Sequence, residues 1–288
     1  MRISTHLWAT ALSLCPALVG SAARAEDVAF VEASSELDDG KPQTTAYNAV
    51  DGKPATAWCT KRDGASGAIL SFGFDTTVTV THIGLVVGEM KGDALDKTNQ
   101  RARVVFVGDA EHLVEAKFKD DGPLQTLELT PPAKGRHIVV EFRDGYAGAA
   151  PDAPLCVAEV VLKNKDQLLT GERTASRLRA LNAPSKRLLH EWLDDVAAPQ
   201  RTLLFNVDGT FTYRFEPLLE GKPAKVRGKW SAIERAVILE VGGHVSRLDA
   251  RLSKVDDGDT HTVELTLSGD PPTPSMAATF RPAPLKLP

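Results

Sequence analysis

The stretch YNAVDGKPATAWCT, residues 47–60, reads as a turn that carries four chemically distinctive side chains. Asp51 and Thr56 bring a carboxylate and a hydroxyl, and Trp58 and Cys59 bring an indole and a thiol. In the simplest interpretation the chain only reverses here, with Asp51 capping its own turn and Thr56 bonding the backbone. A loop that only reverses the chain does not need Thr56, Trp58 and Cys59 at its exit, so we expect this loop to hold something.

Catalytic motifs are absent from the sequence. It has no Gly-x-Ser-x-Gly elbow, no His-Glu-x-x-His pair and no phosphate loop. The acid pairs Asp194–Asp195 and Asp256–Asp257 fit solvated helix ends and turns, and glycosidase carboxylates stay open as an alternative. Six histidines stand singly, without metal-ligand spacing: His82, His112, His137, His190, His244 and His261. We therefore expect a protein without catalytic residues, and an enzyme is the less favoured hypothesis.

The start of the chain predicts export. Arg2 precedes the apolar run LWATALSLCPALVG, and Ala23, Arg24 and Ala25 form a small-x-small cleavage site after it. The run is too short to span a bilayer and contains Pro16. We expect a signal peptide over residues 1–25, cleaved after Ala25, and a mature protein that is secreted or periplasmic, with no transmembrane segment.

Charge and cysteine content narrow the partners and the compartment. The chain has 34 basic and 38 acidic residues, and residues 1–25 carry two of the basic ones, Arg2 and Arg24, so the mature net charge is 32 − 38 = −6. Nucleic acids and anionic membranes need a basic face, so we expect neither as a partner. Cys15 leaves with the signal peptide, and we expect the remaining Cys59 and Cys156 to pair in an oxidising compartment.

Residues 26–163 predict a mainly β domain. Short apolar runs such as GAILSFGF, VTVTHIGLVVG, RARVVFVG and RHIVVEF are separated by Gly, Pro and Asp. Runs rich in Val, Ile and Phe are typical of strands. A mature chain of roughly 260 residues favours about two domains. We therefore expect an antiparallel β-sandwich with long loops as the first domain.

A helical connector is expected over residues 164–200. Five apolar side chains there fall on one face of a helix: Leu188, Leu189, Trp192, Leu193 and Val196. Ser185, which follows Pro184, is the expected N-cap. The apolar stripe is far too short for a coiled coil, so we expect it to dock on a domain.

Residues 201–288 predict a second, smaller β domain. The stretch TLLFNVDGTFTYRF reads as a hairpin around Asp208 and Gly209. Six later segments alternate apolar and polar residues, as a sheet closed around one core requires. Their apolar faces are Phe211, Tyr213 and Phe215; Val226, Gly228 and Trp230; Val237, Leu239 and Val241; Leu248, Ala250 and Leu252; Val263, Leu265 and Leu267; and Met276, Ala278 and Phe280. We expect a small up-and-down barrel or a strongly curved meander sheet.

The second domain loosely resembles lipocalin-like families. The resemblance rests on LLFNVDGTF followed by RGKWS. It implies a cavity for a small apolar ligand, whereas the bulky side chains of the barrel could instead fill its interior.

The first domain resembles discoidin-like domains, also called coagulation-factor type C or galactose-binding-like domains, over Ala33 to Lys163. The family pattern of Asn-x-x-Asp-Gly, then Thr-x-Trp, then a Glu that opens the last strand is matched by Asn48, Asp51, Gly52, Thr56, Trp58 and Glu159. The resemblance is closest to the glycan-binding variant associated with bacterial NAD glycohydrolases. That variant's Asn-x-Arg and its Gly-rich segment before Cys-x-x-Glu are matched by Asn99 to Arg101 and by DGYAGAAPDAPLCVAE.

The resemblance implies a structural Ca²⁺ ion. Many discoidin-like glycan-binding modules bind Ca²⁺ through the residues that correspond to Asp51, Thr56 and Glu159, together with main-chain carbonyls. A hard cation prefers several oxygen ligands of this kind. The alternative stays open that Asp51 caps its turn, Thr56 bonds the backbone and Glu159 is solvated.

The resemblance also brings the cysteines together. Cys59 lies three residues after Thr56, and Cys156 lies three residues before Glu159. If Thr56 and Glu159 converge on one ion, a disulfide between Cys59 and Cys156 would link the first loop to the last strand.

Glycan contacts are expected on loops of the sandwich. We predict Tyr146, Asn99 and Arg101 as ligand-binding residues, and we expect Trp58 to belong to the core. The leading hypothesis is an exported, non-catalytic protein that binds a glycan or another envelope ligand. The alternatives are an envelope structural or assembly factor with a protein partner and, less favoured, an enzyme acting on NAD or glycans.

Overall fold

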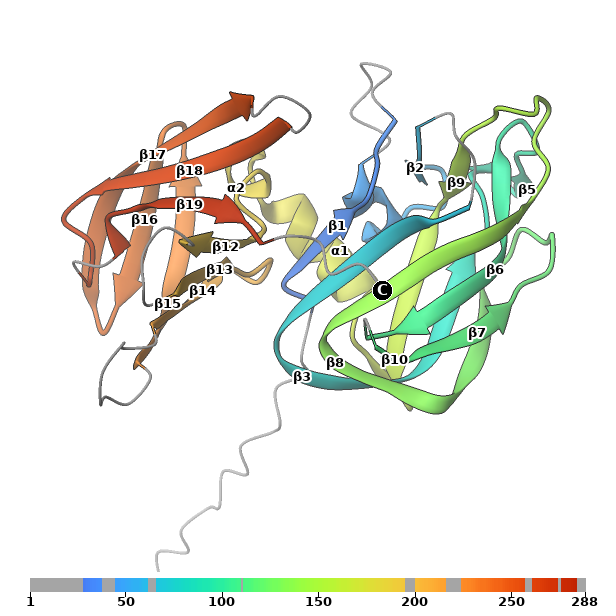
Figure 1. The fold of residues 1–288 in the computed structure, drawn as a ribbon, viewed down its shortest axis with the longest axis horizontal. Coiled ribbons are helices and arrows are strands. Elements are labelled where there is room, and N and C mark those ends of the chain that lie inside the picture. The colour runs from blue at the N-terminus through green and yellow to red at the C-terminus, as the bar shows by residue number, and fades with distance from the viewer. Residues whose placement is uncertain are drawn as a thin grey trace, which may run out of the picture.

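The computed structural model describes residues 28–37, 45–61, 66–109, 111–194, 200–215, 224–256, 261–273 and 276–283. The expected signal peptide, Asp195, Val196 and Asp257 lie outside the described residues. The chain forms two β domains with short helices between them, as Figure 1 shows. The mainly β architecture is therefore confirmed. Among the described residues, no helix has the length and apolar character needed to cross a membrane.

The first domain is a nine-stranded sheet that curls into a sandwich, with strand order β11-β10-β3-β8-β6-β9-β2, and with β1 paired to β3 and β7 paired to β6. The strands are antiparallel except for the parallel pair β6 and β9. The elements are β1 (Phe30–Ala33), the 3-10 helix η1 (Ala46–Val50), β2 (Trp58–Cys59), β3 (Ala68–Val86), β6 (Gln100–Gly108), β7 (Leu113–Lys117), β8 (Gln125–Tyr146), β9 (Leu155–Val157), β10 (Glu159–Asn164) and β11 (Gln167–Leu168). A separate two-stranded hairpin consists of β4 (Met90–Lys91) and β5 (Ala94–Leu95).

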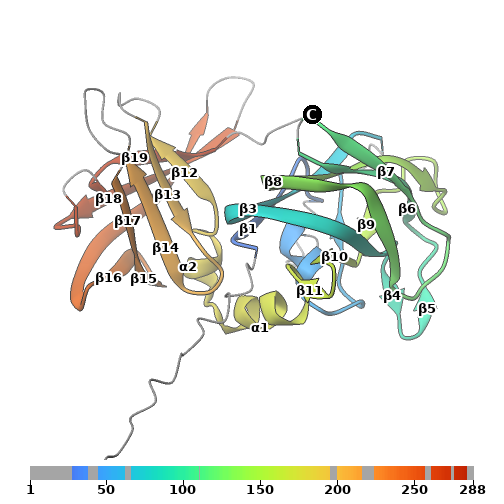
Figure 2. The same cartoon turned by 90° about the horizontal axis from the view of Figure 1, so that it is seen from below.

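The curl comes from the two longest strands, β3 and β8. Their pairing shifts register between Gly73 and Val78 and again between Val80 and His82. Such bulges bend a strand and increase its twist, so one long ribbon can serve both layers. Figure 2 shows both ribbons curving around the interior. The expected sandwich is confirmed, with a core that includes fully buried aromatic residues of β3 and β8: Phe72, Phe74 and Phe142.

The connector contains two short helices, α1 (Glu172–Ala180) and α2 (Ala183–Lys186). The helix that we predicted from Leu188 onward is wrong, because Glu191–Asp194 form strand β12. Ser185 is not the N-cap; the Asn182 side chain accepts the Ser185 N–H at 2.8 Å and caps α2.

Barrel closure explains why the predicted helix is a strand. Trp192 lies opposite Leu203 in β13 and opposite Pro282 in β19. The segment is therefore the first strand of the barrel, and it closes the barrel by pairing with both β13 (Arg201–Phe205) and β19 (Thr279–Pro282). Trp192 is 1% exposed, so its side chain is buried in the strand conformation as it would have been on a docked helix.

The second domain is a closed barrel in which β12 to β19 follow one another in chain order. The expected up-and-down barrel is confirmed, but it begins at Glu191 rather than at Arg201. Its large side chains Phe205, Phe211, Tyr213 and Phe280 are fully buried. The lipocalin-like ligand cavity stays a prediction. The remaining strands are β13 (Arg201–Phe205), β14 (Thr210–Phe215), β15 (Ala224–Ile233), β16 (Ala236–Val241), β17 (His244–Asp256), β18 (His261–Gly269) and β19 (Thr279–Pro282).

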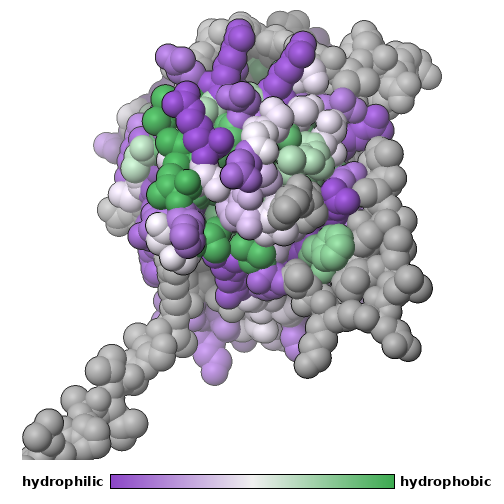
Figure 3. Space-filling model, turned by 90° about the vertical axis from the view of Figure 1, so that its left-hand side faces the viewer, coloured by the Kyte–Doolittle hydropathy of each residue, from purple (hydrophilic) through white to green (hydrophobic). Residues whose placement is uncertain are grey.

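The outer face of the barrel is largely polar. Figure 3 shows hydrophilic side chains over most of this face, with apolar ones in small groups between them. Ile233 and Val245, at 56% and 67% exposed, are apolar side chains that the barrel leaves in solvent. Scattered apolar residues of this kind are normal on soluble surfaces.

Charged side chains join the two domains. Asp75 of β3 pairs with Arg214 of β14 at 2.7 Å. Glu191 of β12 accepts from Arg136 at 3.2 Å and lies 3.0 Å from His137 Nε2, and both partners belong to β8. Burial raises the pKa of Glu191, but its basic neighbours, His137 first among them, lower it further than burial raises it. The domain contact therefore depends on carboxylates that remain ionised.

Candidate functional site

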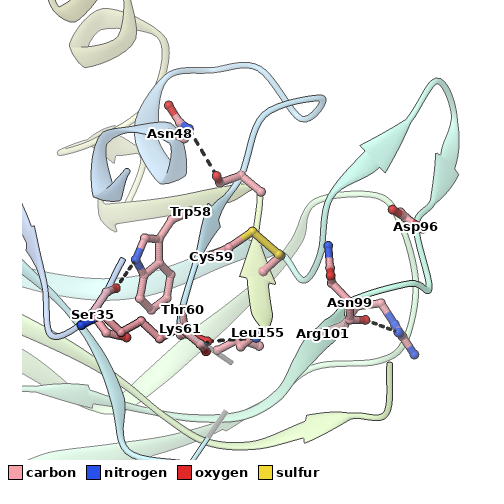
Figure 4. Close-up of a disulfide and its surroundings, with 12 residues drawn as sticks. Ser35, Asn48, Trp58, Cys59, Thr60, Lys61, Asp96, Asn99, Arg101 and Leu155 are labelled. Carbon is pink, nitrogen blue, oxygen red and sulfur yellow. Dashed lines mark hydrogen bonds between the residues drawn. A yellow bond between two sulfur atoms is a disulfide. The ribbon is translucent and has the colours of Figure 1, made fainter. Parts of the chain in front are cut away.

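A disulfide links the first loop of the sandwich to its last strands. Cys59 in β2 lies directly opposite Cys156 in β9. The two sulfurs are bonded, with a Cα–Cα distance of 4.1 Å and a sequence separation of 97 (Figure 4). The pairing that the sequence predicted is confirmed.

Hydrogen bonds hold the loop around this disulfide. Trp58 is fully buried, and its indole N–H donates to the Ser35 carbonyl at 2.9 Å. The Asn48 amide donates to the Ala57 carbonyl at 3.2 Å, as Figure 4 shows. Trp58 therefore belongs to the core, as expected, and its face is not available to a ligand.

The turn at Asp51 is closed by its own side chains. Asp51 Oδ1 accepts the Lys53 N–H at 2.8 Å, and Asp51 Oδ2 accepts the Thr56 hydroxyl at 2.9 Å. Gly52 has a φ of +70°, which glycine adopts without strain. The self-capped turn that the sequence allowed is therefore present.

Glu159 lies beside this turn although it is far from it in sequence. Its side chain is 6% exposed, and its Oε1 atom has no hydrogen-bond partner. Burial and the nearby Asp51 carboxylate raise the pKa of Glu159 to about 8, against the opposing effect of the Lys53 and Gly52 backbone amides. The solvated Glu159 of the alternative interpretation is therefore wrong.

These groups fit a hard cation. Two carboxylates and a hydroxyl gather at one place, and a buried carboxylate oxygen without a partner is costly. A bound Ca²⁺ would use oxygens of this type. Among the described residues no three His, Cys, Asp or Glu side chains form a metal cluster, so such a site would need Thr56 and main-chain oxygens in addition to Asp51 and Glu159.

Helix α1 packs on the same turn, which the sequence did not predict. A Cβ atom at Gly52 would lie 3.2 Å from the Ala175 Cβ atom. Arg179 Nη1 donates to the Asp51 carbonyl at 2.8 Å. The connector therefore supports the turn, and no local sequence signal could have placed Arg179 there.

The predicted ligand-binding residues are neighbours at the end of the sandwich that holds the disulfide. Arg101 in β6 lies opposite Tyr146 in β8, and Asn99 precedes β6. Tyr146 is half-buried, and its hydroxyl donates to the Phe118 carbonyl at 3.0 Å. The guanidinium of Arg103 lies 5.8 Å from the centre of the Tyr146 ring.

Arg101 is an internal anchor. It is 4% exposed and donates to both carboxylate oxygens of Asp120, at 2.7 and 3.2 Å. A third bond, from Nη1 to the Asn99 carbonyl at 2.8 Å, fixes the segment before β6. The bond from Arg101 lowers the pKa of Asp120. The sequence predicted Arg101 as a ligand-binding residue, whereas its burial leaves it little surface for a ligand; it also missed Asp120, because the two are 19 positions apart and only pairing in space connects them.

Residues 24–163 match the family model described as NAD glycohydrolase translocation F5/8 type C domain. The sandwich is therefore similar to the discoidin-like domains that this model describes, and the resemblance inferred from its motifs is confirmed. The match ends at Lys163 and does not include the connector or the barrel. Among the curated proteins compared, none matches the chain.

Several solved structures are similar to part of the chain. The family 32 carbohydrate-binding module of NanJ from Clostridium perfringens, solved with galactose, is 21% identical; 46% of this chain and 90% of that one are covered, with a TM-score of 0.36. A CBM32-5 module from Clostridium perfringens, solved with GalNAc-β-1,3-galactose, is 18% identical, with 46% and 94% covered and a TM-score of 0.37. An F5/8 type C domain from Bacteroides fragilis is 18% identical, with 46% and 88% covered and a TM-score of 0.34.

Proposed function

We propose that this is an exported, non-catalytic binding protein whose discoidin-like sandwich recognises a glycan through the loops at its disulfide end. The supporting observation is that separate loops are tied into one platform there. The Met90 N–H donates to the Pro54 carbonyl at 2.9 Å, which links the β4–β5 hairpin to the Asp51 turn. The Ala149 N–H donates to the Thr98 carbonyl at 2.9 Å, which links the loop after β8 to the segment before β6. A rigid platform costs less conformational entropy when it binds a ligand.

Within this platform Tyr146 and Asn99 are proposed to contact the glycan, and Arg101 to position them. Tyr146 has a partly exposed ring held by its hydroxyl bond, which suits it for contact with a sugar face. Arg101 acts through its bond to the Asn99 carbonyl.

A glycan array probed with the purified mature protein tests this function. We expect binding to a defined set of glycans, and Tyr146→Ala should weaken it by about tenfold or more, which corresponds to about 1.4 kcal/mol. Val245→Ala, an exposed apolar truncation in the barrel, is the control and should bind like the wild type. An array without any bound glycan, or a Tyr146→Ala variant with full affinity, would contradict the proposal.

We also propose that Asp51, Thr56 and Glu159 hold a structural Ca²⁺ ion. The unpartnered oxygen of Glu159 and its closeness to Asp51 support this. A cation there would favour the ionised form of Glu159 beside Asp51, against the burial and the neighbouring charge that raise the pKa of Glu159, and so would stabilise the turn.

Thermal unfolding with Ca²⁺ and with chelator tests the ion site. Chelator should lower the melting temperature of the wild type, and Asp51→Ala should remove that difference. Glu159→Gln should also remove it, and in chelator above about pH 8, where the free Glu159 carboxyl is ionised, it should raise the melting temperature because it deletes the buried charge. Asp93→Ala, at an exposed position of the β4–β5 hairpin, is the matched control and should keep the chelator effect. Identical melting curves with and without Ca²⁺ in the wild type would rule out the site.

A second candidate function is assembly or translocation with a protein partner. The matching family description names the translocation of an NAD glycohydrolase, and this favours a protein ligand for the same sandwich. Co-purification of the tagged mature protein from the envelope fraction, with and without added glycan ligand, separates the two functions. A stable protein complex that glycan does not displace would favour the second candidate, and NAD consumption by the purified protein would favour an enzyme instead.

A further inference from the structure

A hollow of about 1060 Å³ lies between the sandwich and the connector. Its walls come from β1 and the segment after it, from η1 and the Asp51 turn, from α1 and α2, and from the end of β19 with the residue after it. The proposed glycan contacts Tyr146 and Asn99 are not part of its lining. The volume is at the upper end for small-molecule sites, which run to roughly 1,000 Å³. We call this hollow the interdomain groove.

Basic side chains rim the groove on both walls. The sandwich contributes Lys53 and Lys61, and the connector contributes Arg179, Lys186 and Arg187. All five are exposed, although the whole chain has a net charge of −4. Arg179 donates to the Asp51 carbonyl, and the other four make no ion pair with any described residue. Four of the five cations of the groove are therefore left unpaired by the part of the chain that the structure describes.

The acidic residues of the groove are engaged within the protein. Glu32 pairs with His190 Nδ1 at 2.9 Å, and Glu36 accepts the Ala46 N–H at 2.6 Å. Asp51 accepts bonds from its own turn. An incoming ligand would therefore meet five cations against three carboxylates, each of which already has a partner within the protein.

Polar side chains lie between the cations. Ser34, Ser35, Thr45 and Asn48 line the same groove and suit a ligand rich in hydroxyl groups. The cations come from four separate segments. They therefore fit a ligand whose negative charges are spread along its length better than a ligand with a single phosphate group. A sugar chain with a carboxylate on each unit has both properties.

We propose that the interdomain groove is a second binding site, for an acidic oligosaccharide whose carboxylates pair with the cations of its two walls. Lys186 and Arg187 of the connector lie on one wall, and Lys53 and Lys61 of the sandwich lie on the other. The site therefore needs both the discoidin-like domain and the segment that leads to the barrel. It shares the Asp51 turn with the loop platform, but Tyr146 and Asn99 lie outside it.

Calorimetric titration of the mature protein with trigalacturonate, and with the neutral trisaccharide galactotriose, tests the groove. Trigalacturonate should bind, and the double variant K186E/R187E should lose at least tenfold in affinity. K53Q/K61Q, which changes the opposite wall and adds no negative charge, should lose several-fold in affinity for trigalacturonate. The control K134E/K229E makes the same charge change as K186E/R187E at exposed positions outside the groove, and should bind like the wild type.

The outcomes separate this site from the platform. Tyr146→Ala should keep its affinity for trigalacturonate, whereas K186E/R187E should keep its array binding to neutral glycans. Unchanged melting temperatures of the variants would exclude misfolding as the cause of a loss. The proposal is overturned if trigalacturonate does not bind, if galactotriose binds the groove equally well, or if K134E/K229E loses as much affinity as K186E/R187E.

Discussion

Removal of the Cys59–Cys156 disulfide should destabilise the sandwich and leave the barrel largely unaffected. The bond joins two cysteines that lie 97 positions apart in the sequence. Closing a loop of about 100 residues stabilises the folded state by about 4.7 kcal/mol in the chain-entropy model, and native disulfides usually contribute about 2–4 kcal/mol. We expect the double variant Cys59→Ala with Cys156→Ala to lose an amount in this lower range.

The fold itself should survive the change. Trp58 remains buried, its indole keeps the bond to the Ser35 carbonyl, and the Leu155 N–H keeps its bond to the Thr60 hydroxyl at 3.0 Å. Alanine is preferable to serine because Cys156 is fully buried, and burying a hydroxyl costs free energy unless it is hydrogen-bonded.

Hydrogen exchange in increasing denaturant, resolved by peptide, measures the loss separately in each domain. Peptides from β3 and β8 should lose protection by the expected amount, and peptides from β13 and β14 serve as the internal control. Reduced wild-type protein, which keeps both sulfurs, separates the loss of the bond from the loss of side-chain volume. A decrease below about 1 kcal/mol in the sandwich, or an equal decrease in both domains, would refute the reasoning.

Three further predictions follow from single contacts. Burial raises the pKa of Asp75, but Lys225, Arg227 and Arg214 outweigh it and hold that pKa below its ordinary value of 3.8. The contribution of Asp75 to the domain contact should therefore be complete above about pH 4 and lost as the pH falls through the lowered pKa. Hydrogen-exchange protection of β14, measured as a function of pH, would report this loss. Asp75→Asn should remove the pH dependence, and a variant with an unchanged pH profile would contradict the prediction. Gly73→Ala would place a Cβ atom 2.1 Å from the Phe30 ring, so the melting temperature should fall with a loss of about 1–3 kcal/mol, and a neutral effect would show that Phe30 can move. Phe280→Ala, at a fully buried position, should cost the barrel about 3–5 kcal/mol in peptide-resolved exchange, whereas a small loss would favour the ligand cavity over a filled core.

The sequence alone was sufficient for the features that depend on local patterns. Alternating apolar residues identified the barrel strands, because side chains on a strand point to opposite faces in turn. The ordered motifs around Asp51, Trp58 and Glu159 identified the discoidin-like domain, and their spacing from the cysteines predicted the disulfide. Each of these signals lies within a few neighbouring residues or within an ordered set of short motifs.

The tertiary structure decided what depends on partners distant in sequence. The apolar residues from Leu188 to Leu193 fit a helix as well as a strand, and only the open edges of the barrel select the strand. The same holds for Arg101, whose partner Asp120 is brought near by strand pairing. Short apolar segments do not specify their own conformation, because burial of the apolar side chains stabilises a helix and a strand alike. Hydrogen bonding to neighbouring strands then determines which of the two forms.

The interdomain groove is the clearest case of a feature that no sequence pattern contains. Lys61 and Arg187 are ordinary cations in the sequence, and they line one groove because the connector passes beside the first domain. Exposed charged residues produce no periodic pattern in the sequence, because a charged side chain can be solvated at almost any surface position. Their grouping is therefore set only by how the connector packs, through Arg179 on the Asp51 carbonyl and through the Tyr47 hydroxyl, which donates to the Leu189 carbonyl at 2.7 Å.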